Sequence, residues 1–142
     1  THAAARYGHG TANHYGLGLF LDYAGSDAYA STGPTYNGGC AWDRSVALFV
    51  DAGPEKDAYQ LERSGGLGRA DFGGWAVFAD LGGDDRFAAD AGPAGTSRYG
   101  LAVFYHAGGK ADYSALRNPG TPPPAPGAIH TTAPGALFAD KP

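Results

Sequence analysis

The hydrophobic residues of this chain fall into four short runs of the same form. Each run is six residues long, and a phenylalanine stands at its fourth position. The phenylalanines are separated by 29, 29 and 26 residues, and a regular spacing of this length is typical of stacked repeat proteins. The runs are residues 17–22, 46–51, 75–80 and 101–106. The pattern therefore predicts one structural unit that is used four times.

Each run predicts a β-strand that is apolar on both faces. Side chains alternate between the two faces of a strand. One face of each run carries the phenylalanine, and the other carries Leu, Val, Trp, Ala or Tyr at three positions. Such strands are typical of parallel sheets that are covered on both sides. The phenylalanines would stack about 4.8 Å apart, covered by the rest of each repeat, by the C-terminal segment or by a partner.

After each run comes a glycine turn and then an aromatic residue. Glycine and aspartate tolerate the backbone angles of tight turns, so each unit predicts strand, turn, strand. The aromatic residues are Tyr29, Tyr59, Phe87 and Tyr113. The stretches between units, 30–44, 60–74 and 88–100, are rich in glycine and predict the remaining sides and corners of each coil.

These features predict an all-β fold, a right-handed parallel β-solenoid with four coils of 26–29 residues in residues 1–117. Residues 118–142 are rich in proline and predict an extended arm. Residues 136–140 nearly repeat 76–80, which predicts a fifth strand that either caps the solenoid or begins another repeat. A β-propeller or hairpin array is the alternative, but these repeats are short for a four-stranded blade.

Composition narrows the class of protein. The chain has 24 Gly and 10 Pro in 142 residues, but its 13% aromatic residues argue against disorder. The formal charge is −4 without a Lys/Arg cluster, so nucleic acid is not an expected partner. No apolar stretch approaches 18 residues, so no transmembrane helix is expected. Cys40 is the single cysteine, which excludes an internal disulfide and predicts a small buried residue.

Acidic residues recur at two positions of the repeat. Asp22, Asp51 and Asp80 end the first three strands. Asp27, Asp57 and Asp85 precede the aromatic residues, and Asp84 lies beside the last of them. Carboxylates stacked about 5 Å apart repel one another by roughly 1 kcal/mol per pair in water. Either backbone N–H groups of the glycine turns offset this repulsion, or Ca²⁺ lies between the coils.

The seven aspartates are therefore the candidate Ca²⁺ ligands, and Ca²⁺ is the one cofactor expected. In the fourth repeat both acids are replaced, by His106 and Ala111. This predicts that the acidic columns end there and that any ion lies between the first three coils. His106 itself is expected to be a histidine whose hydrogen bonds are satisfied at the end of the column. His2, His9 and His14 match no metal-binding motif and predict loop positions.

The turn Gly82-Gly83-Asp84-Asp85-Arg86-Phe87 resembles the glycine-aspartate turn of RTX Ca²⁺-binding β-rolls. It lacks the second glycine step of that motif, and it recurs every 26–29 residues instead of every nine. Over residues 10–113 the unit is more similar to Gly/Asp-rich repeats of uncharacterised bacterial surface proteins. This resemblance implies an extracellular or cell-envelope location and no particular activity.

No nucleophile elbow, P-loop, zinc-protease or dinucleotide motif occurs in the chain. The sequence therefore predicts a non-catalytic structural or binding module, an accessory subunit that docks on a protein partner or larger assembly. The alternative is a carbohydrate-binding or carbohydrate-active β-helix protein. In that case Tyr29, Tyr59, Phe87 and Tyr113 would form the sugar platform.

Overall fold

The computed structural model describes residues 1–33, 36–61, 66–89, 96–97, 99–116 and 125–141. These residues form strands and turns, and among them there is no helix long and apolar enough to cross a membrane. All strand pairs between described strands are parallel except one, at the C-terminal end. The predicted parallel β-solenoid is therefore confirmed, and a hairpin array or propeller is excluded.

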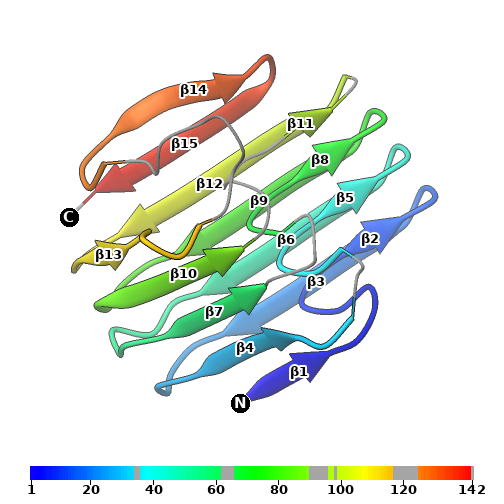
Figure 1. Ribbon diagram of the computed structural model, residues 1–142. Coiled ribbons are helices and arrows are strands. Elements are labelled where there is room, and N and C mark those ends of the chain that lie inside the picture. Colours follow the sequence, from blue (N-terminus) through cyan, green and yellow to red (C-terminus); the bar gives the residue numbers. More distant parts are fainter. Residues whose placement is uncertain (34–35, 62–65, 90–95, 98, 117–124, 142) are drawn as a thin grey trace.

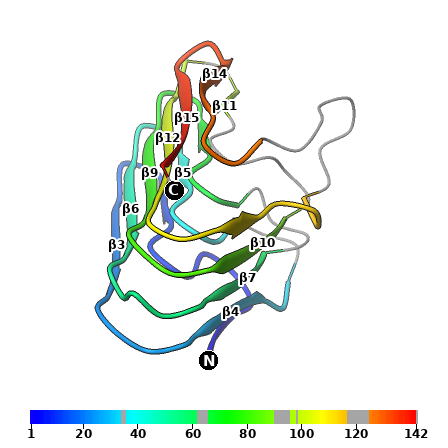
Figure 2. The same cartoon turned by 90° about the vertical axis from the view of Figure 1, so that its left-hand side faces the viewer.

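Three sheets form the walls of the solenoid (Figures 1 and 2). The six-stranded sheet contains β3 (Leu17–Asp22), β6 (Val46–Asp51), β9 (Trp75–Asp80), β12 (Leu101–Ala107), β15 (Ala136–Lys141) and β14 (Ile129–Ala133). The five-stranded sheet contains β1 (His2–Ala4), β4 (Ala28–Ser31), β7 (Ala58–Leu61), β10 (Asp85–Ala89) and β13 (Ala111–Asp112). The four-stranded sheet contains β2 (Ala12–Asn13), β5 (Ala41–Trp42), β8 (Ala70–Asp71) and β11 (Thr96–Ser97).

Each of the four coils passes through the four-stranded, the six-stranded and then the five-stranded sheet. The chain winds around the axis in the right-handed sense (Figures 1 and 2). Strand pairing keeps equivalent residues opposite each other, so that Phe20, Phe49, Phe78 and Phe104 align. The chain therefore completes three full turns between Phe20 and Phe104.

The core consists of two ladders of stacked aromatic rings. In the six-stranded sheet the ring centroids of successive phenylalanines are 5.0, 4.7 and 5.3 Å apart. Tyr29, Tyr59, Phe87 and Tyr113 form the second ladder, with spacings of 5.0, 4.9 and 5.2 Å. The two ladders meet edge to face, as between Tyr59 and Phe78 at 5.1 Å, a geometry that favours aromatic pairs. The rest of each coil is thus what covers the phenylalanines.

The opposite face of the six-stranded sheet points outward and is apolar. Its exposed large residues are Leu17, Leu19, Leu21, Val46, Trp75, Leu101 and Leu137. None of the outward positions of β3, β6, β9 and β12 carries a charge. The expectation of a sheet covered on both sides is therefore wrong, because the winding of the chain encloses only one face.

Glycines stand at an equivalent corner in three successive coils. Gly10, Gly39 and Gly68 all have positive φ, between 67° and 80°. A Cβ atom on Gly39 would lie 2.7 Å from the carbonyl oxygen of Val77 in the next coil. These corners bring the backbones of two coils so close that a side chain does not fit.

We expect Gly39→Ala to lower the free energy of unfolding by about 2 kcal/mol or more, since left-handed strain adds to the contact with Val77. Gly73→Ala is the matched control. Gly73 has a φ of 80° too, but its nearest new contact would be a side-chain carbon of Arg44 at 3.4 Å, so strain alone should cost about 1 kcal/mol. Urea denaturation measures both values, and equal losses would contradict the close packing at Gly39.

The C-terminal segment ends in a hairpin, and one of its strands, β15 (Ala136–Lys141), lies where the fifth strand is expected, at residues 136–140. β15 pairs in parallel with β12 and places Phe138 opposite Phe104, with ring centroids 5.1 Å apart. β14 pairs antiparallel with β15. Phe138 thus adds a fifth ring to the first ladder, and β15 and β14 lie beyond β12 at that end of the solenoid (Figure 2). Residues 117–124, which contain Pro119, Pro122, Pro123 and Pro124 of the predicted proline-rich arm, lie outside the described residues.

Candidate functional site

A column of acidic side chains runs inside the solenoid, at the corner between the six-stranded and five-stranded sheets. Asp22, Asp51 and Asp80 end β3, β6 and β9 and lie opposite one another. The same alignment continues to His106 in β12 and Asp140 in β15. All of these side chains except that of Asp22 are buried. Buried charges are costly unless hydrogen bonds or opposite charges compensate them, so the partners of each group decide what this column can do.

The aspartates at the strand ends cap their own turns. In each case the backbone N–H two residues later donates to Oδ1, at 3.4 Å for Asp22 and 3.3 Å for Asp51 and Asp80. This arrangement matches the hypothesis that the carboxylates are held by the glycine turns. These hydrogen bonds involve Oδ1 of each carboxylate, so Oδ2 remains available for other contacts.

The second acidic column links successive coils. The backbone N–H of Asp27 donates to Asp57 Oδ1 at 2.6 Å, and the N–H of Asp57 donates to Asp85 Oδ1 at 2.7 Å. Asp57 and Asp85 are buried, and both belong to the corner that holds the first column. Asp84 lies outside this corner, since it is exposed and accepts the N–H of Lys110 on the surface.

Tyrosine hydroxyls lie between the carboxylates of the first two levels. The hydroxyl oxygen of Tyr29 is 2.9 Å from Asp22 Oδ2 and 2.7 Å from Asp51 Oδ2. The hydroxyl of Tyr59 donates to Asp51 Oδ2 at 3.1 Å. A phenol has one proton to donate, so the contact of Tyr29 with two carboxyl groups is satisfied when one of them is protonated.

The third level is built differently. Phe87 takes the place of the tyrosine, and His106 takes the place of the aspartate in the next coil. His106 Nδ1 lies 2.6 Å from Asp140 Oδ1, and its Nε2 lies 3.2 Å from Asp85 Oδ2. The prediction that the acidic column ends at His106 is wrong, because Asp140 in the fifth strand continues it.

Burial raises the pKa of three aspartates in the two acidic columns. Burial raises the pKa of Asp57 to about 7 and outweighs the opposite effect of the hydrogen bond from the Asp27 N–H. The charges of Asp51 and Asp85 raise this pKa further. Burial and the charge of Asp85 raise the pKa of Asp80 to about 8, although the Tyr59 hydroxyl, the Gly82 N–H and the charge of His106 oppose this shift. The pKa of Asp51 is also raised by burial.

The histidine and the most exposed aspartate of the column shift for other reasons. Burial opposes the charge on His106, but the hydrogen bonds to Asp85 and Asp140 outweigh it and raise its pKa to about 9. At Asp22, burial is outweighed by hydrogen bonds from Tyr29 and the turn, so its pKa lies below the usual value. The third level thus combines a basic imidazole with the carboxyl group of Asp80, which resists ionisation.

His2 and His9 contact aromatic rings of the core, which their spacing did not predict. His2 stacks on Tyr29 at 5.1 Å and places Nε2 3.2 Å from Asp22 Oδ2. His9 is buried and meets Phe20 edge to face. His14 is exposed and pairs with Asp43 at 2.9 Å. His2 occupies the next rung of the aromatic ladder, a position found only by aligning β1 with β4.

Two further expectations concern Cys40 and the aromatic residues of the second ladder. Cys40 is buried as predicted, and burial raises its pKa to about 12, so its thiol is unreactive at neutral pH. The aromatic residues predicted as a sugar platform, Tyr29, Tyr59, Phe87 and Tyr113, are all buried in the core. They cannot stack on a sugar at the surface.

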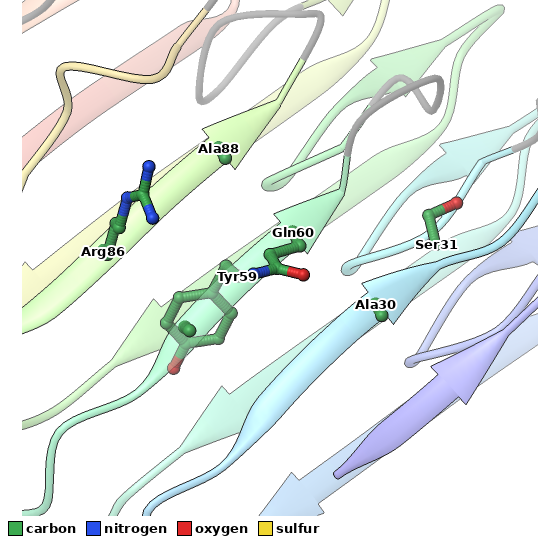
Figure 3. Close-up of a pocket in the computed structure, with 7 residues that line it drawn as sticks. Ala30, Ser31, Tyr59, Gln60, Arg86 and Ala88 are labelled. Carbon is green, nitrogen blue, oxygen red and sulfur yellow. The ribbon is translucent and has the colours of Figure 1, made fainter.

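A shallow depression of about 330 Å³ lies on the five-stranded sheet (Figure 3). Its lining includes Ala30, Ser31, Tyr59, Gln60, Arg86 and Ala88. Arg86 is the one charged residue in this lining. Because the lining brings no acid and base together, we see no catalytic arrangement at this depression.

Comparisons with protein-family models, with curated proteins and with solved structures find no match to this chain.

Proposed function

We propose that this chain is a non-catalytic β-solenoid module that docks on a protein partner through the outward face of its six-stranded sheet. The observation that supports this proposal is the exposed apolar surface on β3, β6, β9 and β12. Leu17 is 78% exposed and Trp75 is 61% exposed. Water-soluble proteins rarely leave such residues side by side unless another surface covers them.

The size of this surface fits the centre of an interface. Four strands about 4.8 Å apart, each with about 3.3 Å per residue, give a patch of roughly 300 Å² in projection. Apolar patches of this size are often functional in monomeric proteins. The regular rows of the parallel sheet make the surface flat, so a partner with a flat apolar sheet or helix face fits it best.

The side chains on this face favour protein over carbohydrate. They are mostly Leu and Val, with Trp75 and Tyr105 as the aromatic exceptions among the outward positions of the four strands. Aliphatic side chains offer no hydrogen bonds to sugar hydroxyls, and the buried aromatic ladder is out of reach. The side chains of the acidic corner are mostly buried and cannot contact a protein partner. The outward face of the six-stranded sheet is therefore the surface proposed for docking.

A photo-crosslinking residue placed at Leu19 should capture one discrete protein in the cells that make this chain. The same residue at Gln60, which is exposed on the five-stranded sheet, is the control and should capture none. Equal crosslinking at both positions would argue against the proposal, and so would crosslinks to glycan alone.

The double substitution Leu19→Lys and Leu101→Lys should reduce that crosslinking, recorded from Trp75, by at least about tenfold. Both side chains are exposed, so the free energy of unfolding should change by only about 1 kcal/mol. Crosslink yield and thermal melting of the purified chain measure the two effects. An unchanged yield would show that partners bind elsewhere.

A further inference from the structure

We propose that Asp80, Asp85 and His106 form a site for a divalent transition-metal ion, with Zn²⁺ as the reference ion, and that Asp140 orients the histidine. One ligand atom from each of the three residues lies within 4.8 Å of the others. All three side chains are buried, with relative exposures of 0%, 1% and 0%. The site lies between the third and fourth coils, at the level where the repeat departs from its own pattern.

The contacts of His106 resemble those of metal-binding histidines. Its Nδ1 is engaged by Asp140 Oδ1 at 2.6 Å, which leaves Nε2 to face Asp85. A carboxylate on one ring nitrogen commonly orients a histidine that binds metal through the other. Two ligands of a tetrahedral zinc ion lie roughly 3.3 Å apart, and the separation of His106 Nε2 from Asp85 Oδ2 is 3.2 Å. The ring is therefore placed to share an ion with Asp85.

Two buried oxygen atoms at this level have no hydrogen-bond partner among the described residues. One is Asp80 Oδ2, although the Tyr59 hydroxyl lies close enough to that carboxyl group to lower its pKa, and the other is the hydroxyl of Tyr113. Burial raises the pKa of the Tyr113 hydroxyl, and the nearby charges of Asp140, Asp80 and Asp85 raise it further. Buried polar atoms are nearly always satisfied. An ion held by Asp80 would supply the partner that this carboxylate lacks.

The change from tyrosine to Phe87 provides the place for the ion. Tyr29 and Tyr59 each bring a hydroxyl to the carboxylates that end the strands. Phe87 stacks on Tyr59 in the same ladder and has no hydroxyl to bring between Asp80 and His106. One oxygen atom is thus removed from the site at the coil where an imidazole is introduced.

The donor set distinguishes this site from the predicted Ca²⁺ ligands. Calcium requires six to eight oxygen ligands, whereas one imidazole and two carboxylates suit zinc and similar ions. The charge of the donor set is suitable as well, because a divalent cation compensates the two carboxylates of Asp80 and Asp85 buried at this level.

The test compares the wild-type chain, refolded with EDTA or with ZnCl₂, with two variants. Zn²⁺ at about 100 times its Kd should raise the Tm of the wild type by roughly 5–10 °C. Titration with CoCl₂ should give one equivalent of the visible absorption typical of tetrahedral Co²⁺. Phe87→Tyr should fold without metal and weaken Zn²⁺ binding at least about 100-fold, because its hydroxyl occupies the place of the ion. Asp51→Asn, in the same column, is the matched control and should retain the Zn²⁺ response.

The outcomes are distinct. Zn²⁺ binding in the wild type that Phe87→Tyr removes and Asp51→Asn retains supports the site. No response of the wild type to Zn²⁺ or Co²⁺ overturns it and leaves protons as the counter-charge. A response to CaCl₂ alone, or a Zn²⁺ response that survives both Phe87→Tyr and His106→Gln, also overturns it. None of these results depends on the protein partner.

Discussion

Phe78→Ala should lower the free energy of unfolding by about 3–5 kcal/mol, the usual cost of removing a buried phenylalanine. Phe78 is fully buried at the middle rung of its ladder. It stacks on Phe49 at 4.7 Å and on Phe104 at 5.3 Å, and Tyr59 and Phe87 meet it edge to face. Its loss opens a cavity that backbones hydrogen-bonded on both sides cannot close.

The control lies three residues away on the same strand. Trp75 is larger than Phe78 but points outward and is 61% exposed, so Trp75→Ala should cost about 1 kcal/mol or less in the isolated chain. Urea denaturation of both variants gives the comparison. If Trp75→Ala proved as costly as Phe78→Ala, the assignment of inner and outer faces would be wrong.

The metal-free protein, kept in EDTA, should lose several kcal/mol of stability between pH 5 and pH 9. Asp57 and Asp80 hold protons in the folded state up to pH values of about 7 and about 8, whereas their usual pKa is 3.8. A carboxyl group with a raised pKa stabilises the fold below its unfolded pKa. That contribution is lost as pH rises through the folded value, at about 1.4 kcal/mol per pKa unit.

The histidine acts in the same direction. The pKa of His106 is raised from 6.5 to about 9, so its contribution is complete below pH 6.5 and is lost as pH rises toward 9. The lowered pKa of Asp22 acts oppositely, but only in strong acid. Stability should therefore be highest in mildly acidic solution.

Melting temperatures recorded at fixed ionic strength from pH 4 to pH 9 measure this dependence. Asp57→Asn should flatten the part between pH 4 and pH 7, since an amide does not titrate. Asp84→Asn changes an exposed residue of the same turn as Asp85 and should leave the slope unchanged. If the stability in EDTA rose with pH, buried Asp57 and Asp80 would not hold protons as described.

The pattern of residues was sufficient to predict the coils, because it repeats at every level of the structure. The spacing of the phenylalanines gives the register, and parallel pairing then aligns each strand with the next. The alternation within each strand also separates inner from outer side chains. The alternation does not predict which face of the strand points inward, because both faces are apolar. The direction in which the chain winds determines the inner face.

Only part of the acidic site could be predicted from the sequence. The aspartate columns follow from the repeat, but their burial depends on the corner where two sheets meet. In the sequence the column stops at His106, because Asp140 is 34 residues away and belongs to a strand beyond the proline-rich segment. The exchange of tyrosine for Phe87 beside the appearance of His106 was readable in the alignment of repeats, and it is the signal that marks the third level.

The hairpin of β14 and β15 controls how the molecule can grow. A parallel solenoid with a bare end strand invites another coil, from its own chain or from a neighbour, and such additions lead to fibres. Here the far edge of β15 is already paired with an antiparallel strand, and that strand has an irregular register between Thr131 and Ala133. A bulged antiparallel edge offers a poor template for parallel pairing. Stacking of solenoids end to end should therefore be blocked at this end, and deleting residues 125–141 should make the chain assemble into filaments.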